Sequence, residues 1–227
     1  LVDAKRFVFG KDSIFVNEII SFMLGLSSVV TVVIIANILF SIKGFKDLEF
    51  FNKFKFHIGG IKAGEKIRLI SSGFLHADYH HLFVNMFTLY FFGDQVVYRL
   101  GAVMFVVVYM VSLLLGNYLS FKFHNNQNNY SAVGASGAVS GIVYSAVLLY
   151  PNMKMALLII PIPLPGYMFA AGYMLYTLYG MKKQQDNIGH TAHFGGSVAG
   201  LLATIVILPS VIVESSFTLL ILAGIIT

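Results

Sequence analysis

The sequence of 227 residues contains no cysteine and few charged side chains. Without cysteine, neither a disulfide framework nor a thiolate metal site can form, and cysteine usage says nothing about the redox compartment. Only 11% of the residues are charged, against roughly 25% in ordinary globular domains, whereas 57% are hydrophobic. A soluble chain of this length could not bury so much apolar surface. The composition therefore predicts an integral membrane protein that is solvated largely by the lipid bilayer.

The basic residues do not form a stripe that could bind nucleic acid. The net charge is +5, but the Lys and Arg residues are scattered through predicted loops, where they are interpreted as solvated charges near anionic lipid. A cleavable signal peptide is not evident either. The first apolar run, residues 19–42, is too long for the apolar region of a signal peptide and has no small-residue cleavage site, so we expect it to remain as a membrane helix.

The apolar segments predict an all-α, polytopic membrane bundle of six transmembrane helices, since a spanning helix needs about 20 mostly apolar residues. These helices are expected at about 19–42, 80–97, 101–121, 134–150, 166–181 and 190–208. The proline-rich stretch 161–166 is assigned to a connection, because proline disrupts a helix interior. The predicted organisation is thus an N-terminal segment 1–18, a core 19–208 and an apolar tail 209–227. The tail could pack on the bundle, lie at the membrane interface or form a short seventh span.

The connection at 43–78 is much longer than the two to eight residues that usually join bundle helices. It is rich in phenylalanine, at Phe45, Phe50, Phe51, Phe54, Phe56 and Phe74. We expect this first loop to fold against the bundle or to dip into the headgroup region, where aromatic side chains are favoured.

Three polar clusters lie at the starts of expected helices, although ionisable side chains inside a membrane are costly and often functional. The clusters are His76, His80, His81 and Asn85 before and in the second helix, Gly134, Ala135, Ser136 and Gly137 at the fourth, and Asn187, His190 and His193 at the sixth. Successive spans alternate in direction, so the starts of these three helices share one membrane face. The clusters are therefore expected to converge.

Pairs of small residues four positions apart indicate which helices touch, because they let helix backbones approach closely in lipid. Such pairs occur in the fourth and sixth expected helices, at Gly137 and Gly141 and at Gly196 and Gly200. Contact between these two helices would bring Ser136 and His193 within reach of each other. The alternative is that the glycines serve packing alone.

The converging residues suit acyl-transfer chemistry. A serine hydroxyl needs a base to become a nucleophile, and a neutral imidazole serves near pH 7, which assigns these roles to Ser136 and His193. The backbone N–H groups at the start of the fourth helix, with His81 and Asn85 one helical turn apart, could donate to an oxyanion. No carboxylate has a spacing that marks it as a third member, so we expect a Ser–His dyad. Without Asp, Glu or Cys close by, the histidines do not predict a metal site.

The motifs resemble those of the rhomboid family of intramembrane serine proteases, with its bacterial-type six-helix core, over residues 19–208. The GxSG motif is present at 134–137, and the AHxxGxxxG motif runs from Ala192 through Gly196 to Gly200. The HxxxxHxxxN signature corresponds to His76, His81 and Asn85. The arginine of the family's first-loop motif matches Arg68, with Glu65 as the accompanying acid.

The resemblance implies that Ser136 attacks the scissile carbonyl with His193 as base, and that the Ser136 N–H, His81 and Asn85 hold the oxyanion. His76 and Arg68 would shape the first loop. It further implies a multi-pass protein of a bacterial inner membrane that cleaves single-span membrane proteins without a cofactor or metal; the oligomeric state is not indicated. The family's aromatic residue four positions after the nucleophile, which stacks on the histidine, is replaced here by Ser140. Its loop tryptophan is replaced by Ile67, and a glutamate near the end of the second helix by Val97.

Two other functions remain open from the sequence. A catalytically inactive rhomboid-like protein would bind membrane clients without cleaving them, but such relatives typically lack the serine or the histidine, and this chain has both. A transporter would show inverted-repeat symmetry and broken helices in corresponding halves, and neither is clear here.

Overall fold

Residues 27–155, 163–183 and 188–226 are described in a computed structural model of the chain. The long helices are α2 (Ser28–Lys46), α6 (Tyr79–Leu100), α7 (Ala102–Phe123), α8 (Ser136–Leu149), α9 (Gly166–Lys183) and α10 (His190–Ile207), followed by the short α11 (Val211–Glu214) and α12 (Ser216–Ile226). The connections contain α3 (Leu48–Phe54), β1 (Phe56–His57), α4 (Ile58–Lys62), α5 (Arg68–Ser71), the 3₁₀ helix η1 (Ser72–Phe74), β2 (Ser131–Ala132), β3 (Lys154–Met155) and β4 (Leu164–Pro165).

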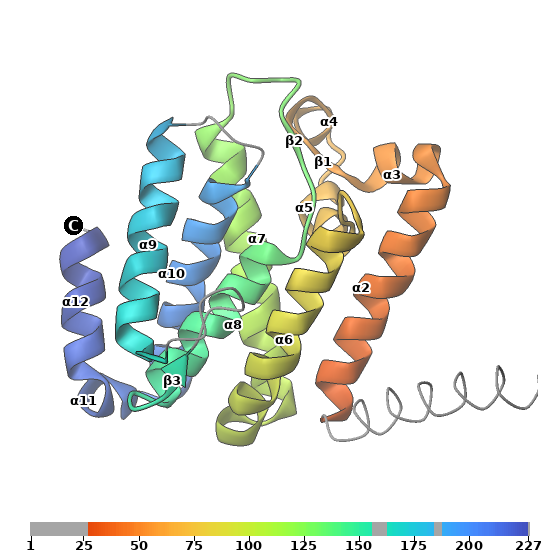
Figure 1. The fold of residues 1–227 in the computed structure, drawn as a ribbon. Helices are drawn as coiled ribbons and strands as arrows, with labels where there is room; N and C mark the ends of the chain where they lie inside the picture. The colour runs from red at the N-terminus through yellow and green to blue at the C-terminus, as the bar shows by residue number, and fades with distance from the viewer. Residues whose placement is uncertain (1–26, 156–162, 184–187, 227) are drawn as a thin grey trace, which may run out of the picture.

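The long helices form one bundle, which confirms the predicted all-α polytopic fold (Figure 1). Within the described residues, three of these helices, α2, α7 and α10, are long and apolar enough to cross a membrane. Helices α6 and α9 have 22 and 18 residues and carry more polar side chains. The second to sixth helices, α6 to α10, each begin within two residues of the predicted position. The expected start of the first helix, at residue 19, lies outside the described residues.

The first helix ends later than predicted. It was expected to stop at residue 42, but α2 continues to Lys46, and the N–H of Asp47 still bonds the carbonyl of Lys43. Two lysines in the last turn, Lys43 and Lys46, favour this extension because cations stabilise the negative end of a helix dipole. The first loop is correspondingly shorter than its predicted range of 43–78.

Helix α8 lies at the centre of the bundle, and it is short. Its 14 residues extend about 21 Å, less than the ~30 Å of a bilayer core. Every residue from Gly137 to Leu149 is buried, so protein rather than lipid surrounds it. The chain runs down from β2 into the bundle before α8 begins (Figure 1). Ser136, the first residue of α8, consequently lies inside the bundle and below its rim.

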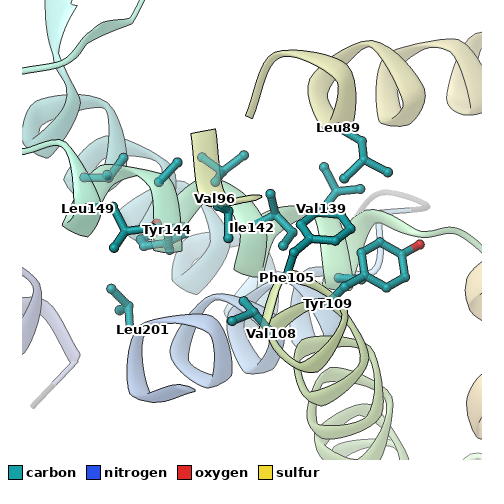
Figure 2. Close-up of a cluster of buried hydrophobic side chains, with 14 of the residues drawn as sticks. Leu89, Val96, Phe105, Val108, Tyr109, Val139, Ile142, Tyr144, Leu149 and Leu201 are labelled. Carbon is teal, nitrogen blue, oxygen red and sulfur yellow. The ribbon is translucent and has the colours of Figure 1, made fainter. Parts of the chain in front are cut away.

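Buried apolar side chains from α6, α7, α8 and α10 form the main core around α8 (Figure 2). Phe105 and Tyr109 of α7 face Val139 and Ile142 of α8 there. On the side of α8 that faces α10, small residues bring the backbones of these two helices together. A Cβ added to Gly196 would lie 2.0 Å from the carbonyl oxygen of Gly137. The predicted contact between the fourth and sixth helices is therefore present.

The first loop folds against the bundle, as predicted. Strand β1 pairs with β2 in an antiparallel register that places Phe56 opposite Ala132. Phe56 is buried with Ile58 and Ile61 in a second, smaller apolar cluster. The loop is thereby joined to the segment that leads into Ser136.

The C-terminal tail packs on the bundle. Helix α12 runs beside α9 (Figure 1), and the ring centroids of Tyr167 and Phe217 are 5.1 Å apart. The hydroxyl of Ser215 donates a hydrogen bond to the carbonyl of Leu148 at the end of α8. The described part of α12 has 11 residues, which extend about 17 Å. The described tail therefore packs on α8 and α9, as the first of the three possibilities predicted.

Candidate active site

The segment before Ser136 has a backbone conformation that only glycine adopts readily. Gly134 has φ of +133°, and its N–H donates to the carbonyl of Ser72 at 3.0 Å. The next N–H, that of Ala135, faces Nε2 of His76 at 3.4 Å. Helix α8 starts immediately afterwards, so the backbone N–H groups of its first turn have no acceptor within the helix.

Ser136 and His193 are in direct contact. The distance between Oγ of Ser136 and Nε2 of His193 is 2.6 Å. His193 lies in the first turn of α10, where its own N–H bonds the carbonyl of Gly189. The imidazole is 9% exposed and the serine is half-buried, so the pair is mostly shielded from solvent. At this distance the imidazole could accept the proton of the serine hydroxyl.

The other ring nitrogen of His193 contacts a residue that the motifs did not indicate. The hydroxyl of Tyr173, on α9, lies 3.1 Å from Nδ1 of His193 and 3.2 Å from Oγ of Ser140. The two rings have centroids 6.2 Å apart. The aromatic neighbour that was expected at position 140 is thus supplied by another helix. The replacement of that aromatic residue by serine was the available signal, but it did not say where the substitute lies.

His81 packs against the segment before the nucleophile. A Cβ added to Gly134 would lie 2.6 Å from Cε1 and 2.8 Å from Nε2 of His81, and 3.5 Å from Oγ of Ser136. The imidazole, the glycine and the serine hydroxyl therefore share one small space. Glycine is required at 134 both by its positive φ and by this contact.

Asn85 is buried one turn along α6, and its side-chain amide donates to the carbonyl of His81 at 2.9 Å. An amide carries two N–H donors, so a second remains for another acceptor. The structure brings the ring of His81 close to Ser136, and Asn85 is bonded to the backbone of His81 one turn further along α6.

His76 connects the first loop to the segment that leads into Ser136. Oγ of Ser41 lies 3.1 Å from the carbonyl of Phe74, to which it donates, and 2.8 Å from Nδ1 of His76. Ser41 therefore accepts from Nδ1–H, which leaves Nε2 of His76 to accept from Ala135. Burial, with a smaller contribution from His81, lowers the pKa of His76 to about 3. Because its ring is neutral and both of its nitrogens have hydrogen-bond partners, we interpret His76 as a structural residue and not as a group that transfers protons.

Arg68 holds the first loop together. Its Nη1 donates to the backbone carbonyls of Asn52 and Lys55 at 2.8 and 2.9 Å, and its Nε pairs with Glu65. Ile67, which stands where the family has tryptophan, is 56% exposed and does not anchor the loop.

The carboxylate closest in sequence to the histidines of the second helix, that of Asp78, has a structural role. Asp78 caps α6 by accepting from the N–H of His81 at 2.7 Å, and this bond lowers the pKa of the Asp78 carboxyl. Asp186, like the cluster member Asn187, lies outside the described residues. His124, which was not assigned a chemical role, stacks on Tyr130 with ring centroids 3.7 Å apart and bonds Thr191.

Residues 63–210 match the model of the rhomboid domain. The chain belongs to the rhomboid family. Among its relatives, "Rhomboid protein 1, mitochondrial" of Saccharomyces cerevisiae is 31% identical over 140 residues, which are 60% of this chain and 40% of that protein. "RHOMBOID-like protein 12, mitochondrial" of Arabidopsis thaliana is 26% identical over 167 residues, 67% and 49% of the two chains. The human "Presenilin-associated rhomboid-like protein, mitochondrial" is 27% identical over 139 residues, 59% and 36%.

The match to the rhomboid domain and the apolar helices together show that the chain is an integral, multi-pass membrane protein. The chain spans less than half the length of these three relatives. All three are named as mitochondrial, so they do not support the bacterial inner membrane that was expected from the motifs.

Proposed function

We propose that this rhomboid protein is an intramembrane serine protease in which Ser136 is the nucleophile and His193 the general base. The single observation that carries the proposal is the 2.6 Å contact between Oγ of Ser136 and Nε2 of His193 at the start of a buried helix. Family membership supports it, since rhomboid proteins are generally proteases of this type.

In the first half-reaction, Nε2 of His193 takes the hydroxyl proton of Ser136 while Oγ attacks the scissile carbonyl carbon. The carbonyl π bond breaks and its electron pair moves to the oxygen, which gives a tetrahedral oxyanion. When the intermediate collapses, the C–N bond breaks and the imidazolium returns its proton to the leaving amine. The acyl group stays on Ser136. In the second half-reaction His193 takes a proton from a water molecule while the water oxygen attacks the ester carbonyl carbon. When this second tetrahedral intermediate collapses, the bond between the acyl carbon and Oγ breaks, His193 returns the proton to Oγ of Ser136, and the carboxylic acid leaves.

The oxyanion would be held by donors that converge beside Ser136. The backbone N–H of Ser136 belongs to the free first turn of α8 and lies at the positive end of its dipole. The ring of His81 reaches the same space, as its approach to Gly134 shows. Asn85 has one amide N–H in use and a second to offer. Donors that are aimed before the charge develops cost no reorganisation during the reaction.

The substrates that suit such a site are single-span membrane proteins. Ser136 lies inside a bundle that is itself solvated by lipid, so a substrate must reach it from the bilayer or its boundary. A peptide bond within a helix is shielded by its own hydrogen bonds. Cleavage is therefore expected where the substrate helix unwinds easily.

The test uses the purified chain in detergent or lipid with a model single-span substrate and a fluorophosphonate probe. Wild-type protein should cleave and become labelled. Ser136→Ala and His193→Ala should each lose at least ~10³-fold in cleavage rate. Ser131→Ala, which removes an exposed hydroxyl five residues earlier, is the matched control and should keep its activity.

Labelling that survives in Ser136→Ala would refute the nucleophile. A wild-type protein that binds single-span clients without cleavage or labelling would instead support the client-binding alternative.

The identity of the membrane is a separate part of the proposal. The motif resemblance favours a bacterial inner membrane, whereas the relatives named above are mitochondrial. Fractionation of the source cells, with detection of the native chain, distinguishes the two locations.

A further inference from the structure

We propose that Tyr173 is the positioning residue for His193, and that its hydroxyl, bonded onward to Ser140, holds the imidazole with Nε2 facing Ser136. This inference rests on the proposed proteolytic function. It adds Tyr173 and Ser140 to the side chains that the motifs indicated.

The hydroxyl of Tyr173 lies between two partners. It is 3.1 Å from Nδ1 of His193 and 3.2 Å from Oγ of Ser140. Together with the contact between Ser136 and Nε2, these distances join four side chains from α8, α9 and α10 into one hydrogen-bonded chain. Ser136 and Ser140 are one turn apart on α8, so the chain leaves that helix and returns to it.

The direction of these bonds decides the tautomer of His193. A base must present an unprotonated Nε2 to the hydroxyl of Ser136, so the ring proton must be on Nδ1. Tyr173 then accepts from Nδ1–H and donates its own hydrogen to Ser140. If the bonds ran the other way, Nε2 would carry the proton and could not act as a base. Ser140 permits the productive direction because its oxygen can accept the hydrogen of Tyr173.

The same bond is expected to strengthen during the reaction. Once Nε2 has taken the proton of Ser136, the ring is an imidazolium and both of its nitrogens are donors. Hydrogen bonds from a charged donor are stronger than neutral ones. The oxygen of Tyr173 faces Nδ1 and would stabilise that cation. The contribution therefore falls on kcat more than on KM.

Helix α9 is fixed next to α8 close to this point. The hydroxyl of Tyr144, on α8, donates to the carbonyl of Ala170 at 2.7 Å. Ala170 is fully buried and lies three residues before Tyr173. Ser140, also buried, is small enough to leave Tyr173 beside His193. The serine at the position where the family has an aromatic residue and the tyrosine on α9 therefore belong to one arrangement.

Tyr173→Phe tests the inference, because it keeps the ring and removes only the hydroxyl. We expect kcat for the single-span substrate to fall about tenfold, the effect of losing one hydrogen bond, while KM stays within about twofold. The rate of fluorophosphonate labelling should fall in parallel. Tyr179→Phe is the matched control, since it makes the same change on an exposed ring of α9 and should leave all three values unchanged.

Ser140→Ala should lower kcat by a smaller factor, about threefold. In a double-mutant cycle, Tyr173→Phe with Ser140→Ala should lose less than the product of the two single losses, because Ser140 acts through Tyr173. A role in packing alone does not predict this coupling.

The tautomer of His193 gives a readout that is independent of turnover. It can be measured by ¹⁵N NMR of labelled histidine, with His193→Ala to assign the signals. Wild-type protein should show a protonated Nδ1, and Tyr173→Phe should show a mixture of the two tautomers.

The outcomes are distinguishable. An active wild-type protein with unchanged kcat and tautomer in Tyr173→Phe would overturn this inference alone. A wild-type protein that neither cleaves nor becomes labelled would overturn the proposed function, and the catalytic part of this inference with it.

Discussion

Nε2 of His193 lies 2.6 Å from Oγ of Ser136, although the two residues are 57 positions apart in the sequence. Their helices can approach so closely because glycines face each other along the contact. An added Cβ on Gly196 or Gly200 would meet backbone atoms of Gly137 or Gly141. The close approach of these two side chains therefore depends on residues that have no side chain.

This contact leads to a first prediction, on Gly196→Ala. The new methyl group would lie 2.0 Å from the carbonyl oxygen of Gly137, and a backbone atom cannot turn aside as a flexible side chain can. Helix α10 must shift, so we expect a loss of stability of about 1–3 kcal/mol and a loss of at least ~10²-fold in kcat/KM. Thermal unfolding in detergent and cleavage kinetics measure both effects.

The matched control is Gly224→Ala on α12, where an added Cβ meets nothing within 4 Å. That variant should keep wild-type activity and stability. Normal activity in Gly196→Ala would show that the site tolerates a wider separation of α8 and α10 than the structure implies.

The second prediction concerns Gly134→Ala. Alanine there is strained by φ of +133° and would also press on the ring of His81, which lies 2.6 Å from the added carbon. The proposed oxyanion donors should then be misaligned, and we expect kcat to fall at least ~10²-fold, the cost of losing one such donor. Steady-state cleavage kinetics provide the measurement.

Gly101→Ala is the control that separates the effect of backbone strain from the effect of the contact with His81. Gly101 has φ of +84°, but an added Cβ there meets nothing within 4 Å. Because its ψ of 164° places it in a region that is nearly restricted to glycine, the variant should lose about 1–3 kcal/mol of stability and retain activity. Equal losses of kcat in the two variants would argue against a specific role for His81.

The third prediction is an acid sensitivity that arises from His76. In the folded protein its pKa is lowered to about 3, from 6.5 when exposed, mainly by burial. Above pH 6.5 the imidazole is neutral in both states and the folded state carries no penalty. As the pH falls from 6.5 toward 3, the unfolded chain binds a proton that the folded chain does not, so stability is progressively lost.

His76→Gln should remove this component and flatten the dependence of the unfolding midpoint on pH between about 6.5 and 4.5, although it lowers the midpoint at pH 7.5 by breaking buried hydrogen bonds. His80→Gln, at an exposed histidine, should keep the wild-type slope. If His76→Gln kept that slope as well, another buried group would have to be responsible.

Much of this architecture was predictable because the bilayer constrains it strongly. An apolar segment in lipid must form a helix to satisfy its backbone hydrogen bonds. The apolar segments of the sequence therefore indicated a helical bundle and the starts of its helices. Alternation of direction then placed three polar clusters on one face. The glycine pairs indicated which helices touch, and the structure brings Ser136, His193 and His81 together accordingly.

Other features depended on contacts that no local pattern encodes. Tyr173 lies in a helix with aromatic residues on several sides, and in lipid an outward-facing tyrosine looks the same in sequence as one that faces a catalytic histidine. The shortness and full burial of α8 likewise follow from its neighbours. Motifs and hydropathy were sufficient for the Ser136–His193 pair. Only the packing of α9 against α8 and α10 decided that Tyr173 and Ser140 join it, because a hydrogen bond between helices depends on their relative position and rotation.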